Sequence, residues 1–322
     1  MWPNARAYLP FLVTESAREA VLRLAFQKSV SLVPHSYRTH LDAMRGEFLD
    51  LAGSRLYYYA AGSRGAGEPV VFIHGFPASS HLWHDVVPLM PPGHRLVVLD
   101  LLGFGRSDRP AADAKSALTA LAHGTRVRDL MDQLRIDVAC IVGHGAGGAA
   151  AQALALNWPE RVSRLCLVNS TAFSFWPRRA ARLARTVSAA PRLGRALGAP
   201  LLAGLVHGSL LSGFADRERG RHALDQYLHA FSARLGVDAL IAQLRAMRDS
   251  SVRALGERLG SLRIPVAVVW GSADPFLSLR VGERLRSVIA GATLDVIPGA
   301  RHFTPEEAPD RIATAVAALL RR

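Results

Sequence analysis

Short, continuously apolar segments recur along this chain, and each leads into glycine or a polar residue. Five of them are rich in β-branched residues and occupy positions 69–73, 95–100, 138–144, 164–170 and 264–271. Runs of this length, apolar on both faces, are typical of parallel strands that helices cover on both sides. Helical patterns separate them at 118–134, 146–158 and 281–290. The alternation predicts an open α/β fold with a mostly parallel sheet.

The two ends of this region add further strands. Residues 47–53 and 54–62 have the pattern of a hairpin with Gly53 and Ser54 as its turn. Residues 292–300 form a last predicted strand, and 305–321 form a closing helix. The predicted sheet therefore has eight strands, flanked by helices.

The alternation is interrupted once, by about ninety residues between the strands at 164–170 and 264–271. Residues 173–261 mix apolar runs with arginines and have the pattern of helices and loops. We expect them to form an inserted helical lid. The core is then 46–172 and 262–322, and residues 1–45 form an N-terminal helical extension.

Ligands of open α/β sheets bind at the carboxyl ends of the strands, so the residues after each strand are the candidates for chemistry. The first buried strand is followed by His74, Gly75 and Phe76. Later strands lead into the segment from Gly143 to Gly148, which includes His144, Gly145 and Ala146. The last two lead into Asp274 and His302.

This ordered set of motifs resembles the α/β-hydrolase superfamily over about residues 46–322. The resemblance is strongest to the lid-bearing esterases, epoxide hydrolases, dehalogenases and C–C bond hydrolases. It implies that Asp274 is the acidic member of the catalytic set and that His302 is the general base. It also implies an oxyanion loop at His74–Gly75, with the amides of Phe76 and Ala146 as the oxyanion donors.

Position 145 departs from the family pattern. The family motif is G-x-S-x-G, with the nucleophile at a sharp turn between strand and helix. Here Gly143-His144-Gly145-Ala146-Gly147 places glycine where the nucleophile belongs. Glycine has no side chain to attack with, so no acyl- or alkyl-enzyme can form there. It accepts the strained backbone of this turn without cost, so the fold is expected to survive the change.

Three functions remain open at this stage. The first is an enzyme in which His302, oriented by Asp274, performs acid–base chemistry on a hydrophobic carbonyl compound without a covalent intermediate. Hydrolysis, decarboxylation, elimination and cyclisation all fit such a site. The second is a serine hydrolase inactivated by serine-to-glycine replacement. The third is a non-catalytic relative that binds a ligand or a partner.

Other residues around the predicted pocket have more than one interpretation. His74, Gly75 and His144 are candidates for substrate binding, although packing beneath the site explains His144 better. Trp176, at the start of the lid, either lines the pocket or packs in the core. We expect no metal and no cofactor. In particular, Gly103 and Gly105 form no dinucleotide site, since no G-x-G-x-x-G sequence opens a helix there.

Positive charge is concentrated outside the predicted core. The chain has a formal net charge of +13; residues 1–45 contribute +3 and residues 173–261 contribute +8. A solvated arginine-rich face, an acidic carrier protein and an anionic membrane surface are the three interpretations, and no nucleic-acid-binding module is recognisable. The cysteines Cys140 and Cys166 lie in apolar strands, which suits free thiols and a cytoplasmic protein, with peripheral membrane attachment left open.

Overall fold

The structure is a computed structural model, and it describes residues 46–51, 53–63, 67–110, 115–173, 204–231, 236–246 and 251–322. The predicted N-terminal extension, Trp176 and the first part of the predicted lid fall outside these residues. Residues 45–322 form one compact unit.

The core is an eight-stranded sheet with the strand order β1-β2-β4-β3-β5-β6-β7-β8. Its strands are β1 (Glu47–Leu51), β2 (Ser54–Gly62), β3 (Val70–Ile73), β4 (Arg95–Leu99), β5 (Ala139–His144), β6 (Val162–Val168), β7 (Val266–Gly271) and β8 (Thr293–Ile297). The hairpin β1–β2 and the pair β2–β4 are antiparallel, and all other pairs are parallel. The predicted fold class is therefore confirmed.

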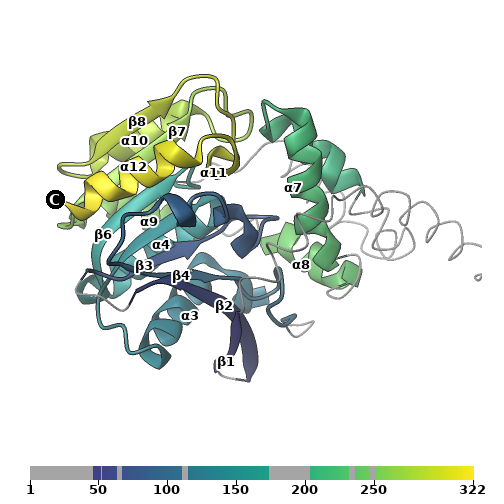
Figure 1. Ribbon diagram of the computed structural model, residues 1–322, viewed down its shortest axis with the longest axis horizontal. Helices are drawn as coiled ribbons and strands as arrows, with labels where there is room; N and C mark the ends of the chain where they lie inside the picture. Colours follow the sequence, from purple (N-terminus) through teal and green to yellow (C-terminus); the bar gives the residue numbers. More distant parts are fainter. Residues whose placement is uncertain are drawn as a thin grey trace, which may run out of the picture. The chain divides into compact units, whose positions relative to one another are not determined.

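Continuous apolar sequence explains the centre of this sheet. Every residue of β3, β5 and β7 is buried, as expected for strands covered on both faces. In the parallel part, Ile73 pairs with Gly143 and Leu167 also pairs with Gly143 across the sheet. This register aligns the ends of the strands, so the loops that follow β3, β5, β6, β7 and β8 emerge along one edge (Figure 1).

Helices pack against this sheet and against each other. They are α3 (Ala120–Gln133), α4 (Gly145–Asn157), α9 (Ser251–Arg258), α10 (Leu279–Val288), α11 (Thr304–Glu307) and α12 (Pro309–Leu320). Helix α4 contacts α3, α9, β5 and β6, whereas α12 contacts β6 and β7. The single closing helix predicted at 305–321 is wrong: the segment forms two helices. Ala308 between them has φ −145°, because the residue before a proline avoids helical backbone.

The described part of the segment between β6 and β7 is helical. Residues 204–210 are helical, and the helices α7 (Arg217–Ala230) and α8 (Gly236–Ala246) follow them. Asp216 caps α7 by accepting hydrogen bonds from the amides of Glu218 and Arg219, at 2.9 and 3.2 Å. Helix α7 contacts the 3₁₀ turn η1 (Ser80–Trp83), which follows β3 (Figure 1).

Helix α8 contacts a second 3₁₀ turn, η3 (Lys115–Leu118). Helix α9, by contrast, packs on α3 and α4. The exact bounds of the lid, 173–261, stay a prediction. Among the described residues, the helices are all too short or too polar to cross a membrane.

Candidate active site

A buried histidine and a buried carboxylate face each other after the last two strands. Asp274 follows β7, and His302 follows β8. The His302 Nδ1–H donates to Asp274 Oδ2 at 2.8 Å, and both side chains are almost inaccessible to solvent. This bond leaves the His302 Nε2 lone pair as the basic atom. The two residues that the resemblance implied as base and acid are thus brought together.

The Asp274 carboxylate is held from several sides. Its Oδ1 accepts from the backbone amides of Phe276 and Leu277 at 2.7 and 3.0 Å, and Oδ2 also accepts from Asn169 Nδ2 at 2.7 Å. Burial by itself raises the pKa of Asp274, but His302 and these donors outweigh it and hold that pKa below its usual value. The carboxylate is therefore ionised and can stabilise a protonated His302 ring.

Asn169 was given no role by the sequence analysis. It directly follows β6 in a left-handed conformation, with φ +40°. Its Oδ1 accepts from the amide of Gly271 at 3.2 Å and from Thr304 Oγ1 at 2.9 Å, while its Nδ2 donates to Asp274. One amide side chain therefore joins the ends of β6 and β7 to α11. The only signal in the sequence is a polar residue at the end of a buried apolar strand.

Gly145 lies at the turn between β5 and α4. Its φ of +54° belongs to the left-handed region, which glycine adopts freely. A Cβ built there lies 3.6 Å from Gly75 Cα and 3.7 Å from His302 Nε2, both ordinary van der Waals distances. The turn therefore has room for a small side chain, and His302 Nε2 lies next to that space. What is missing is the side chain.

His144 and His74 are buried beneath the site. The His144 Nε2–H donates to the carbonyl oxygen of His302 at 3.0 Å. Burial and the neighbouring His302 ring lower the pKa of His144 to about 3, so it is neutral. The backbone amide of Leu101 donates to His74 Nε2 at 3.0 Å, and the His74 Nδ1–H donates to the carbonyl of Gly75 at 2.9 Å. Both rings thus hold the backbone of loops that form the site.

The amides of Phe76 and Ala146 lie beside Gly145. Ala146 is in the first turn of α4, where amides have no partner within the helix. No protein group in the described ranges accepts from the amide of Phe76. Both residues and Gly75 line a cavity of about 30 Å³, which Gln243 of α8 and Val252 of α9 also line. This volume holds about one or two water molecules.

The serines near the site make contacts with other parts of the chain. Ser170 is buried; its Oγ accepts from Gln152 Nε2 at 2.9 Å and lies 3.1 Å from the carbonyl oxygen of Thr171. Ser79 accepts from the amide of His81 and so caps η1. The amide of Ser80 donates to Asp100 at 2.5 Å. None of these contacts pairs a hydroxyl with His302.

Comparison with known proteins decides the family. A family model described as the alpha/beta hydrolase fold matches residues 68–309. The chain belongs to the α/β-hydrolase fold family. Several relatives are named as hydrolases, and the chain covers most of their length. A 2-hydroxy-6-oxononadienedioate/2-hydroxy-6-oxononatrienedioate hydrolase from Klebsiella pneumoniae is 27% identical, with 89% of this chain and 99% of the relative covered.

Two further members of the family support the same assignment. Haloalkane dehalogenase 2 from Mycobacterium tuberculosis is 28% identical, with 86% of this chain and 95% of the relative covered. Among solved structures, a hydrolase from Pseudomonas aeruginosa superposes with a TM-score of 0.69 at 27% identity. That match covers 87% of this chain and 100% of the hydrolase chain. The fold and the family of this protein are therefore those of hydrolases.

Proposed function

We propose that this protein is an enzyme that performs acid–base chemistry on a small hydrophobic carbonyl compound without forming a covalent intermediate. The observation that carries the proposal is the His302–Asp274 pair beside Gly145. The hydrogen bond of 2.8 Å leaves His302 Nε2 facing the position that a nucleophile would occupy. A base in this orientation can act on a water molecule or on the substrate itself.

The proposed step is direct hydrolysis. His302 Nε2 takes a proton from a water molecule as the water oxygen forms a bond to the substrate carbonyl carbon. The electron pair of the carbonyl moves onto its oxygen, and the amides of Phe76 and Ala146 stabilise that negative charge. When the tetrahedral intermediate collapses, the protonated His302 returns its proton to the leaving group. Asp274 stays ionised throughout and supports the charged ring.

The named activities of the relatives favour hydrolysis over the other candidates. The Klebsiella and Mycobacterium relatives are a hydrolase and a dehalogenase, and a Caulobacter relative at 28% identity is named a putative carbamate hydrolase. Decarboxylation, elimination and cyclisation require only proton transfer and an oxyanion site, so they are the next reactions to test. The expected contacts of the basic insertion with an acidic carrier or an anionic membrane stay predictions.

A second candidate is a serine hydrolase that has lost its nucleophile. Its specific support is the free space at Gly145, where an added Cβ meets nothing closer than 3.6 Å. A serine hydroxyl at that position has room to reach His302 Nε2. In this case Gly145→Ser restores esterase activity and labelling by a fluorophosphonate, whereas the unmodified protein turns over no substrate.

The deciding experiment measures turnover of short-chain aryl esters and lactones by the unmodified chain, His302→Ala and Gly145→Ser. A matched control is His222→Asn, a histidine on α7 for which no hydrogen bond or ion pair with the described site residues is present. We expect His302→Ala to lower kcat/KM by about 10²–10⁴-fold, the usual contribution of a general base, and His222→Asn to leave it unchanged. Turnover that is equal in His302→Ala and in the unmodified chain contradicts the proposal.

A further inference from the structure

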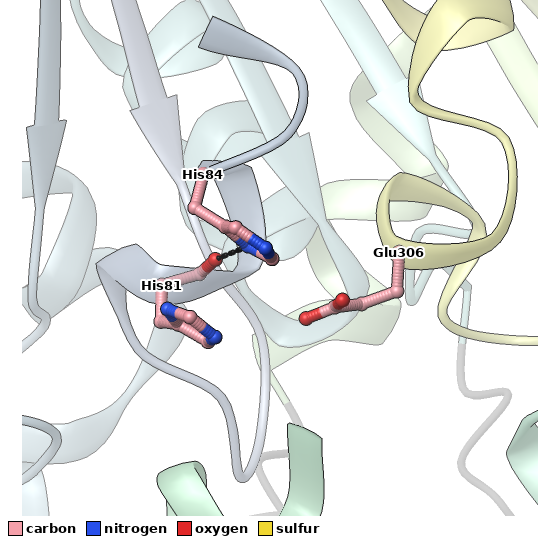
Figure 2. Close-up of side chains that lie close together, drawn as sticks. All are labelled: His81, His84 and Glu306. Carbon is pink, nitrogen blue, oxygen red and sulfur yellow. Dashed lines mark hydrogen bonds between the residues drawn. The ribbon is translucent and has the colours of Figure 1, made fainter. Parts of the chain in front are cut away.

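A second cluster of side chains, outside the proposed reaction, lies where η1 meets α11. His81 belongs to η1, His84 is the residue that caps the end of η1, and Glu306 belongs to α11. One possible ligand atom from each lies within 4.8 Å of the other two. Figure 2 shows the three side chains converging from these two elements. The sequence predicts no metal there, because Glu306 is far from both histidines along the chain.

The histidines are arranged in the way that metal-binding imidazoles usually are. The His84 Nδ1–H donates to the carbonyl oxygen of His81 at 2.7 Å, and Nε2 lies 3.1 Å from Asp85 Oδ1, so a metal at Nε2 would replace the proton shared with that carboxylate. In most metal-binding histidines, the ring nitrogen that does not bind the metal donates a hydrogen bond of this kind, which orients the ring. The two rings stack with their centroids 4.1 Å apart and an interplanar angle of 4°. Stacking at this distance disfavours charge on both rings at once, so at least one ring is neutral, the form that binds metals.

His81 has spare bonding capacity. It is 8% exposed, and its Nδ1 is buried without a hydrogen-bond partner among the described residues. A buried polar atom without a partner is uncommon and calls for an explanation such as an ion or a water molecule. Its ring packs edge-on against Tyr227 of α7, with the centroids 6.1 Å apart. The ring is thus held by packing, and its Nδ1 has no hydrogen-bond partner among the described residues.

Glu306 supplies the negative charge. Its side chain is only 2% exposed, and one of its oxygens accepts a hydrogen bond from the Tyr227 hydroxyl. The other oxygen lies 3.7 Å from Arg219 Nε, too far for a good hydrogen bond, and that Nε has no hydrogen-bond partner in the described ranges. Arg219 is instead bound to Asp85 through its Nη2. Glu306 is therefore only partly neutralised by Arg219.

We infer that His81, His84 and Glu306 form a binding site for a divalent transition metal of the zinc type. Two imidazoles and one carboxylate are a ligand set that zinc uses, with a fourth position left for water or a further carboxylate. Asp85 is a candidate for that position, because its Oδ1 lies 3.1 Å from His84 Nε2. The ligand atoms of a tetrahedral zinc ion lie about 3.4 Å apart. Side-chain rotations that move each ligand atom by about 1 Å would therefore bring the cluster to the spacing that the ion requires.

Such an ion would connect two loops of the candidate active site. The segment containing His81 and His84 follows the loop that carries the Phe76 amide, and α11 follows His302 directly. Binding would therefore fasten the oxyanion loop to the loop of the base. Because the site is separate from Gly145, metal binding is testable whether or not the proposed reaction occurs.

The test titrates the full-length chain, first stripped with EDTA, with ZnCl₂ by calorimetry, and with CoCl₂ by visible absorption. We expect one zinc ion per chain, a tetrahedral cobalt spectrum and a higher Tm with zinc. The variants are His84→Asn, Glu306→Gln and His81→Phe, the last of which retains an aromatic ring against Tyr227. We expect each to weaken zinc binding by about 100-fold or more, with folding checked by circular dichroism.

The matched control is His222→Asn on α7, which leaves the cluster intact. We expect it to bind zinc like the unmodified chain. Absence of saturable one-to-one binding overturns the inference. So does an equal loss of affinity in His222→Asn, or unchanged affinity in folded His84→Asn and His81→Phe, since the metal would then be bound by other residues.

Discussion

Replacing Gly145 with alanine separates the conformational role of the glycine from its chemical one. The added Cβ meets Gly75 Cα at 3.6 Å and His302 Nε2 at 3.7 Å, so it fits without displacing a neighbour. The cost then comes from the backbone, because φ is +54° and an L-residue in the left-handed region loses about 1–2 kcal/mol. Alanine also lowers the conformational entropy of the unfolded chain, and this stabilises the folded state by about 0.4–1 kcal/mol. We expect a net loss of about 1 kcal/mol.

Two other glycines calibrate this value. Gly299 also has a positive φ, +74°, and a Cβ there meets nothing within 4 Å, so Gly299→Ala measures the backbone cost alone. A Cβ on Gly147 would lie 2.2 Å from the backbone oxygen of His74. Gly147→Ala must therefore move main chain, and we expect it to lose at least about 3 kcal/mol.

The assay is urea unfolding followed by tryptophan fluorescence, with Tm from calorimetry as a second readout. A loss of about 1 kcal/mol corresponds to a fall in Tm of about 2–4 °C in a domain of this size. Gly145→Ala and Gly299→Ala should agree within about 0.5 kcal/mol. A loss at Gly145 as large as that at Gly147 would refute the reasoning, because the turn would then have no room for a side chain.

Three further predictions concern the groups around the site. Because the pKa of Asp274 is lowered by folding, its ionised carboxylate stabilises the folded state above about pH 4. This stabilisation is lost as the pH falls through the folded-state pKa. In urea titrations at decreasing pH, the difference in unfolding free energy between the unmodified chain and Asp274→Asn should therefore shrink. Asn169→Ala leaves several buried polar groups without partners and should lower the free energy of unfolding by about 3 kcal/mol in urea; a change below about 1 kcal/mol would contradict its bridging role. Burial raises the pKa of the Cys166 thiol to about 12 and that of the Cys140 thiol well above its ordinary value. A disulfide reagent at about pH 8 should therefore label neither cysteine in the native protein and both in urea. Rapid labelling of the native protein would show that the strands open.

Much of the fold was predictable because its strands are apolar on both faces. Buried parallel strands leave a continuous hydrophobic signal, and all eight predicted strands are present. The break at Ala308 was also readable, since Pro309 follows it, but an amphipathic pattern across 305–321 concealed it. The motif order located Asp274, His302 and Gly145 through resemblance to a family. Periodicity alone would not have singled them out.

Other parts of the site left little or no pattern in the sequence. Asn169 acts through hydrogen bonds to Asp274, Gly271 and Thr304, partners more than a hundred residues further along the chain. The contact of Glu306 with the segment of His81 and His84 likewise depends on how α11 packs on η1. Such contacts arise from the arrangement of the elements, and no local spacing encodes them.

By itself, the sequence determined that the protein has a parallel α/β core and that position 145 offers no nucleophile, because both are properties of residue types. Only the tertiary structure decided that His302 Nε2 faces that position. Parallel strands with aligned ends bring Gly145, Asp274 and His302 to one edge of the sheet, and the distances there follow from packing. The same packing brings His81 and His84 beside Glu306, where a chemically competent site arises that composition does not reveal.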